Sequence, residues 1–105
     1  MGLLDFLMGN KNDKIQDFIS RKAIIIDVRT KNEFTLGAIV GSKNIPLQVI
    51  QSKITEIKKL NKPIITCCAS GMRSGSAANL LNSHGIETIN GGGWKSLNQS
   101  IAHKT

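Results

Sequence analysis

The sequence has few residues of several kinds, and each shortage excludes a class of protein. Two cysteines among 105 residues are too few for a small secreted fold held together by disulfides. Two prolines exclude a proline-rich linker, and no apolar stretch approaches the roughly 18–20 residues of a membrane span. The first residues lack the charged, apolar and small-residue regions of a signal peptide. We therefore expect a protein of the reducing cytoplasm, with free thiols and no membrane span.

Acidic residues are also scarce, because 7 Asp and Glu stand against 14 Lys and Arg and leave a net charge of +7. A strongly basic chain raises the possibility of a nucleic-acid partner. The lysines, however, are scattered along the chain, tyrosine is absent, and no aromatic residues are interleaved with the basic ones. We expect a solvated basic surface that favours anionic substrates, and no nucleic-acid partner.

The remaining composition is that of one ordinary globular domain. The chain has a mass of 11.4 kDa, with 40% hydrophobic and 20% charged residues. We assign residues 13–100 to the domain, residues 1–12 to an N-terminal segment that includes an apolar patch at residues 3–8, and residues 101–105 to a C-terminal tail. We expect the protein to be a monomer.

Four apolar runs predict strands. The run at residues 23–28, Ala-Ile-Ile-Ile-Asp-Val, is continuous and rich in β-branched residues. A continuous run is typical of a strand that is buried on both faces, as in a parallel sheet. Shorter runs predict three further strands, at residues 40–45, 64–67 and 86–89.

Helical patterns separate these strands. Five helices are expected. The first follows a cap at Asn12 or Asp13, and the second runs from a cap at Thr30 through Phe34. The third presents an apolar face of Ile50, Ile54, Ile57 and Leu60, the fourth extends from Gly71 to about His84, and the fifth begins near Trp94. The three glycines at residues 91–93 predict a tight loop before the last helix. The alternation predicts an α/β fold: a small, mostly parallel β-sheet flanked by helices on both faces. Sites in such sheets form at the carboxyl ends of the strands.

A nucleophile is predicted where the third strand ends. Residues 66–74 read Thr-Cys-Cys-Ala-Ser-Gly-Met-Arg-Ser, so a strand ends in cysteine before a small-residue loop, an arginine and a helix. The N–H groups of such a loop form an anion-binding nest, and the positive end of the helix adds to its field. A cysteine in this nest is expected to be a thiolate nucleophile with an oxyanion cradle. The predicted substrate-binding residues of the loop are Ala69, Ser70, Gly71, Met72 and Arg73, of which Arg73 offers paired donors to an anion.

Four segments in order resemble those of single-domain rhodaneses, which are persulfide-forming sulfurtransferases. The segments are Asp27-Val28-Arg29 with Glu33-Phe34, the stretch from Gly37 to Asn44-Ile45-Pro46, the stretch from Pro63 to Ser74, and Gly91-Gly92-Gly93-Trp94. The match as a whole covers roughly residues 15–97. The sequence therefore resembles a rhodanese-like domain over most of its length.

The resemblance implies an activity. Cys68 is expected to take a sulfur atom from thiosulfate or from a persulfide donor, and to hold it as a persulfide. A thiol, cyanide or a partner sulfur-carrier protein would then accept the sulfur. No organic cofactor is expected. No metal is expected either, because the two cysteines with His84 and His103 do not have zinc-finger spacing.

The sequence departs from the family pattern at three positions. Ala38 stands where histidine is usual, which affects local packing more than chemistry. Ala69 stands where many members carry arginine, so one positive charge beside the loop is missing and the substrate preference is open. Trp94 falls earlier than the usual tryptophan.

Two adjacent cysteines leave two interpretations of the loop. Counted from Cys68, the loop to Arg73 has six residues, as in sulfurtransferases; counted from Cys67, it has the longer pattern of cysteine phosphatases and arsenate reductases. The strand register of the resemblance favours Cys68 and makes Cys67 a small buried hydrophobic residue. The alternatives are a Cys67-based phosphatase or arsenate reductase, and a non-catalytic rhodanese-like module that binds a partner or senses oxidants.

Asp27 and Arg29 end a strand at the same edge of the sheet as Cys68. We expect Asp27 to hold a neighbouring loop by accepting backbone N–H bonds. Arg29 has two interpretations: it faces the site and binds substrate, or it pairs with Glu33. Trp94 is expected to form a wall of the site or part of the core.

Overall fold

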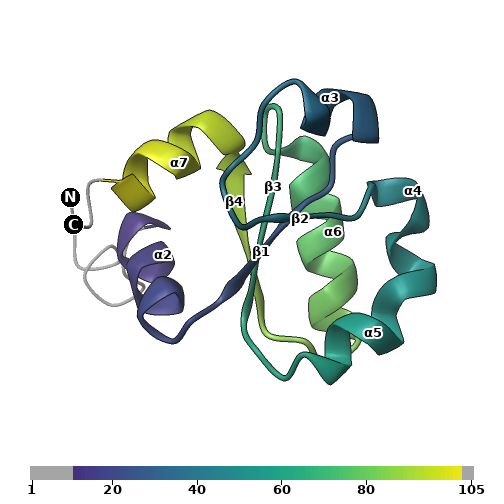
Figure 1. The fold of residues 1–105 in the computed structure, drawn as a ribbon. Coiled ribbons are helices and arrows are strands. Elements are labelled where there is room, and N and C mark those ends of the chain that lie inside the picture. Colours follow the sequence, from purple (N-terminus) through teal and green to yellow (C-terminus); the bar gives the residue numbers. More distant parts are fainter. Residues whose placement is uncertain (1–10, 103–105) are drawn as a thin grey trace.

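The chain forms a four-stranded parallel sheet in the order β2-β1-β3-β4, seen in a computed structural model that describes residues 11–102 (Figure 1). The strands are β1 (Ile24–Asp27), β2 (Lys43–Asn44), β3 (Ile64–Cys68) and β4 (Thr88–Gly93). Every neighbouring pair of strands is parallel. The predicted α/β class is therefore confirmed.

Helices cover both faces of the sheet (Figure 1). They are α2 (Lys11–Ser20), α3 (Lys31–Thr35), α4 (Leu47–Ile50), the 3-10 turn η1 (Gln51–Lys53), α5 (Ile54–Lys59), α6 (Met72–Ser83) and α7 (Trp94–Ala102). One core joins the sheet to α4, α5 and α6, and the other joins it to α2 and α7. No helix among these described residues is long and apolar enough to cross a membrane.

All five residues of the central strand β3 are buried. This burial explains why the strand contains no charged residue. Successive side chains of a strand point to opposite faces, so Ile64 and Cys68 join the core under α6, whereas Ile65 and Cys67 join the core under α2 and α7. The two adjacent thiols therefore lie on opposite faces of the sheet.

The run of glycines at residues 91–93 does not form the predicted tight loop. These residues are the end of β4, where Gly93 pairs with Cys68 of β3 after a register irregularity between Thr66 and Cys68. The reason is close packing: a Cβ on Gly91 would lie 2.7 Å from Ile65 Cγ2 and 2.9 Å from the Thr66 carbonyl oxygen. Glycine here permits close approach of two strands.

Two other predicted elements differ in extent. The second strand has two residues rather than the six expected at 40–45, and Val40 is 98% exposed, so the turn before β2 is not part of the sheet. The single helix expected through residues 50–60 is divided into α4, η1 and α5. Its predicted apolar face is retained, because Ile50 and Ile57 are buried in the core under α6.

The first and last helices of the described residues also differ from the expected helix cap and tail. Asn12 and Asp13 lie inside α2, which includes Lys11, and neither is its cap; Asp13 instead occupies the first turn, where a negative charge suits the helix dipole. At the other end α7 extends through Ala102. The apolar patch at residues 3–8 and His103 lie outside the described residues.

Candidate active site

Cys68 is the last residue of β3, at the carboxyl edge of the sheet where a site was expected. A three-residue connection, Ala69–Gly71, leads directly into α6. Gly71 adopts φ +102°, and a Cβ there would lie 3.3 Å from the Gly92 Cα atom. A side chain at this position would strain the turn and press on β4, so glycine allows the sharp change from strand to helix.

The loop directs hydrogen-bond donors at the Cys68 sulfur. The Gly71 N–H lies 3.0 Å from Sγ, and the Ser74 N–H lies 3.4 Å from it. The Ser74 Oγ atom is 3.3 Å from Sγ and 2.7 Å from the Asn90 Oδ1 atom. One hydroxyl proton serves one acceptor at a time, so Ser74 donates to the sulfur when Cys68 is a thiolate. The arrangement is a nest that stabilises negative charge on sulfur.

These contacts determine the acidity of Cys68. Burial acts to raise the pKa of the thiol, but hydrogen bonds from the Ser74 side chain and from the backbone N–H groups of Ser74, Gly71 and Ser70 oppose it. The hydrogen bonds prevail, and the pKa of Cys68 lies below the ordinary cysteine value. Cys68 is thus the more acidic of the two thiols.

Cys67 has the opposite environment. Its side chain is buried in the core formed by Ile15, Phe18, Ile39, Ile65 and Leu97. Burial, with a smaller contribution from the nearby Asp27 carboxylate, raises the pKa of Cys67 to about 12. Such a thiol is protonated near neutral pH and is a poor nucleophile.

Arg73 lies at the start of α6, and its guanidinium contacts Glu33 of α3. Arg73 Nη1 is 2.8 Å from Glu33 Oε1, and Arg73 Nη2 is 3.0 Å from Glu33 Oε2. The hydrogen bond from Arg73, followed by one from the Thr30 backbone, lowers the pKa of Glu33 to about 2. The paired donors that the sequence assigned to an anionic substrate are thus directed at a carboxylate of the chain itself.

Arg29 is buried and forms an ion pair with Asp27, with 2.6 Å between Arg29 Nη2 and Asp27 Oδ2. Arg29 also donates to the carbonyl oxygens of Gly37 and Glu33, at 2.8 Å and 3.3 Å. Its guanidinium stacks 4.8 Å from the Trp94 ring centroid. The sequence left two interpretations for Arg29: substrate binding or pairing with Glu33. Arg29 does contact Glu33, but through the Glu33 backbone carbonyl oxygen rather than its carboxylate. Asp27 accepts a backbone N–H from Arg29, two residues along the chain, rather than from a separate loop, and its main partner is the Arg29 side chain.

The other predicted loop residues follow Cys68 in the chain, in the connection to α6 and at the first residue of that helix. Ala69, Ser70 and Met72 are exposed, whereas Cys68 itself has no exposed surface. Among the residues described, no group of three or more His, Cys, Asp or Glu side chains could hold a metal ion.

Sequence reasoning missed Asn90 in β4 as a part of the site. The Asn90 amide nitrogen donates to the Gly71 carbonyl oxygen at 3.0 Å, and its oxygen accepts from Gly92 N–H and from Ser74 Oγ. Asn90 thereby joins β4 to the end of the loop at Gly71 and to Ser74 in the first turn of α6. Its signal in the sequence is weak, because an asparagine before glycines predicts a turn.

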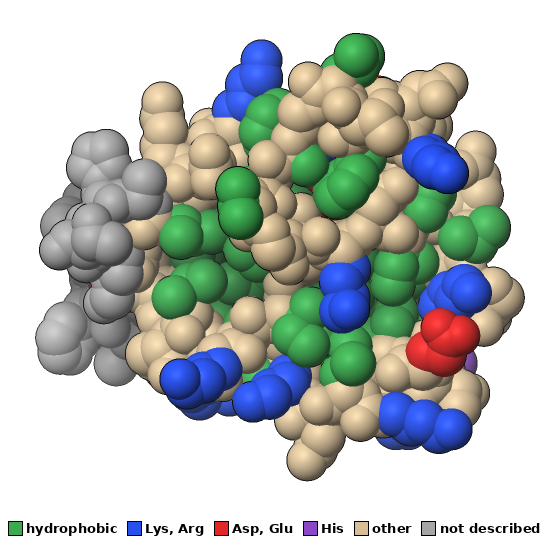
Figure 2. Space-filling view, viewed as in Figure 1, with side chains coloured by type: hydrophobic (Ala, Val, Ile, Leu, Met, Phe, Trp, Pro, Cys, Tyr) green, Lys and Arg blue, Asp and Glu red, His purple; other side chains and the backbone are tan. Residues whose placement is uncertain are grey.

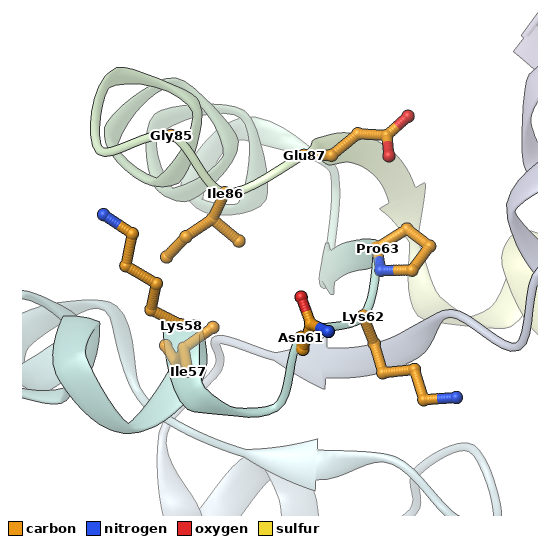
Figure 3. Close-up of a pocket in the computed structure, with 8 residues that line it drawn as sticks. All are labelled: Ile57, Lys58, Asn61, Lys62, Pro63, Gly85, Ile86 and Glu87. Atoms are coloured by element: carbon orange, nitrogen blue, oxygen red, sulfur yellow. The ribbon is translucent and has the colours of Figure 1, made fainter.

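A pocket of about 310 Å³ lies away from Cys68, at the amino ends of β3 and β4 (Figure 3). Its walls include Pro63, which precedes β3, and Glu87, which precedes β4. Figure 3 shows Ile86 pointing into the pocket and the Lys62 amine pointing away from it. Cys68 and the loop that follows it do not line this pocket, so it is separate from the candidate active site.

Lys and Arg side chains lie at several separate places on the face seen in Figure 2, rather than in one continuous patch. This distribution agrees with the scattered lysines of the sequence. Charge alone therefore indicates no single binding surface on that face.

This chain is a parallel α/β domain in which a cysteine follows a central strand and lies in a nest of N–H groups. These features place it in the class of proteins whose active site is a cysteine loop. Within that class, the family model described as Rhodanese-like domain matches residues 11–100. The chain belongs to the rhodanese-like domain family, as the sequence resemblance predicted.

Known proteins of similar sequence and structure agree with this assignment. The chain is 41% identical to the uncharacterized protein YqhL of Bacillus subtilis over 86 residues, which are 80% of this chain and 68% of that protein. It is 32% identical to the thiosulfate sulfurtransferase GlpE of Ectopseudomonas mendocina over 74 residues, 70% of this chain and 67% of that protein. A Staphylococcus aureus rhodanese-like domain protein has a TM-score of 0.69 and 29% identity, with 83% of this chain and 86% of that chain covered.

Proposed function

We propose that the protein is a sulfurtransferase that moves sulfane sulfur from thiosulfate or a persulfide donor to a thiophilic acceptor through a persulfide on Cys68. The observation that carries the proposal is the convergence of the Gly71 and Ser74 N–H groups on the Cys68 sulfur. Membership of the rhodanese-like family supports it, as does similarity to a protein named thiosulfate sulfurtransferase.

The first half of the reaction loads Cys68. Its thiolate attacks the outer sulfur of thiosulfate, the S–S bond of thiosulfate breaks, and sulfite leaves with the electron pair. The negative charge then resides on the terminal sulfur of the Cys68 persulfide, where the N–H groups of the loop stabilise it. Because Cys68 has no exposed surface, the atoms that cover it have to move before a donor sulfur can contact Sγ.

The second half returns the enzyme to its starting state. An acceptor such as cyanide or a thiolate attacks the terminal sulfur, the persulfide S–S bond breaks, and Cys68 leaves as a thiolate. With cyanide the product is thiocyanate, and with a thiolate it is a new persulfide. The reaction is thiol exchange chemistry, so its rate depends on the thiolate fraction and on access.

The placement of Cys67 supports this proposal over phosphatase or arsenate-reductase chemistry. A phosphatase loop counted from Cys67 would need the Cys67 sulfur within the nest, but Cys67 points to the opposite core and its pKa is raised to about 12. The lowered pKa of Cys68 supports catalysis over a purely binding module, since packing alone needs no thiolate.

Turnover measurements test the proposal. Wild-type protein is expected to form thiocyanate from thiosulfate and cyanide, with negligible hydrolysis of aryl phosphates. Cys68→Ser should abolish thiocyanate formation, whereas the matched variant Cys67→Ala should retain it. Phosphatase activity that disappears in Cys67→Ala and persists in Cys68→Ser would overturn the proposal.

A further inference from the structure

Both arginines of the candidate site are already paired with carboxylates of the chain. Arg29 is held by Asp27, and Arg73 is held by Glu33 through two hydrogen bonds of 2.8 Å and 3.0 Å. A small dianion such as thiosulfate is bound best by unpaired cationic donors. The two ion pairs therefore make the site less favourable for a dianionic sulfur donor such as thiosulfate.

Glu33 is fixed in place by α3 as well as by Arg73. Its Oε1 atom accepts the Thr30 backbone N–H at 3.0 Å and the Thr30 hydroxyl at 3.1 Å, while its own N–H donates to Thr30 Oγ1 at 3.2 Å. These contacts form a capping box at the start of α3. An anionic donor that binds Arg73 has to displace a carboxylate that is already oriented and ionised.

Two exposed hydrophobic side chains lie near the ion-paired residues in the sequence. Leu36 lies one turn after Glu33 and is 90% exposed, and Met72 immediately precedes Arg73 and is 82% exposed. Exposed side chains of this size offer apolar surface to an organic group. Thiosulfate has no carbon to place against them, whereas an organic persulfide has.

We propose that Glu33 is a specificity-determining residue: it neutralises Arg73 and thereby makes the site prefer organic persulfides over thiosulfate. The inference rests on the proposed sulfurtransferase function. In the preferred reaction the Cys68 thiolate attacks the terminal sulfur of R–S–SH. The S–S bond of the donor breaks, R–S⁻ leaves with the electron pair, and the proton stays on the sulfur now bound to Cys68. The protonated persulfide carries no charge and has no need of Arg73.

The test compares the loading of Cys68 by two donors in the same variants. The donors are thiosulfate and the persulfide of N-acetylcysteine methyl ester, whose organic part is uncharged. Glu33→Gln retains a side chain suited to the capping box but removes the charge that neutralises Arg73. In Glu33→Gln we expect kcat/KM for thiosulfate to rise about tenfold or more, which corresponds to the lower end of the contribution of one hydrogen bond to a charged group. We expect no change in kcat/KM for the persulfide.

Two further variants separate charge from structure. Thr30→Ala removes a contact of the capping box but leaves the carboxylate on Arg73, so the preference for the persulfide should persist. Arg73→Ala combined with Glu33→Gln should cancel the gain with thiosulfate, because the freed cation is then missing.

The possible outcomes distinguish this inference from the function on which it rests. Failure of both donors to load wild-type Cys68 would overturn the proposed function and the inference with it. If wild-type protein is loaded, but Glu33→Gln leaves the ratio of the two donors unchanged, the sulfurtransferase function stands and the role of Glu33 is refuted.

Discussion

The acidity of Cys68 comes from single contacts, chiefly those of Ser74. Because the pKa of Cys68 is lowered by these hydrogen bonds, the thiolate forms at lower pH than in an ordinary cysteine. The rate of sulfur loading is therefore expected to rise with pH and to reach its plateau below the ordinary thiol range.

Ser74→Ala should move the midpoint of that pH profile upward, since it removes the hydroxyl donor and keeps the backbone N–H. Loading rates measured across a pH series, in wild-type and variant protein, provide the comparison. Identical midpoints in the two proteins would show that Ser74 does not tune the thiol.

The buried ion pair of Asp27 and Arg29 makes a prediction about stability. Asp27→Ala leaves the buried Arg29 guanidinium without its carboxylate, a change that costs about 3–5 kcal/mol in other proteins. Urea unfolding should show a loss in this range. Asp17→Ala is the control, because its ion pair with Arg21 is exposed and such pairs contribute about 1 kcal/mol or less. Equal losses for the two variants would contradict the assignment.

At the level of elements, the close approach of β3 and β4 depends on Gly91. A Cβ there would meet Ile65 Cγ2 at 2.7 Å, Leu97 Cδ2 at 2.9 Å and backbone at 2.9 Å, so neighbouring atoms have to shift. We expect Gly91→Ala to lower the free energy of unfolding by about 3 kcal/mol, the upper range for overpacking.

Gly41→Ala is the matched control for this change. Its φ of +87° is strained for alanine, but its added Cβ meets nothing within 4 Å. Only the backbone strain of about 1 kcal/mol is then expected. Denaturant unfolding of both variants decides the question, and a smaller loss for Gly91→Ala than for Gly41→Ala would refute the packing argument.

The length of the loop between β3 and α6 makes a prediction about function. Insertion of one glycine between Ala69 and Ser70 should move the Gly71 and Ser74 N–H groups away from the sulfur, because both now converge on it. Sulfur loading should weaken, since stabilisation needs donors about 3 Å from the developing charge. The kinetics of loading measure this, and an unchanged rate would show that the convergence is not required.

How well elements could be predicted from sequence depended on what positions them. The runs at β1 and β3 carry their own signal, because β3 is buried, β1 is buried or half-buried, and both contain consecutive isoleucines. The glycines of β4 read as a turn because their role is to fit against Ile65 and Leu97, which are distant in the sequence. The length of β2 likewise depends on where it meets β1, at Ile26 and Asp27.

At the level of the whole molecule, the place of the site was predictable but its network was not. Parallel strands bring their carboxyl ends to one edge, so Cys68 and Asp27 had to share it. The contacts from Arg73 to Glu33 and from Ser74 to Asn90 join residues 40 and 16 positions apart. Such pairs are determined by how α3 and β4 pack around the loop, and one sequence contains no local pattern for them.

The central claim is that Cys68 carries the transferred sulfur, and mass spectrometry tests it most directly. Wild-type protein incubated with a sulfur donor should gain the mass of one sulfur atom, peptide mapping should locate it on Cys68, and cyanide should remove it. Cys67→Ala should behave in the same way, and Cys68→Ser should gain nothing. Sulfur located on Cys67, or retained in Cys68→Ser, would contradict the account.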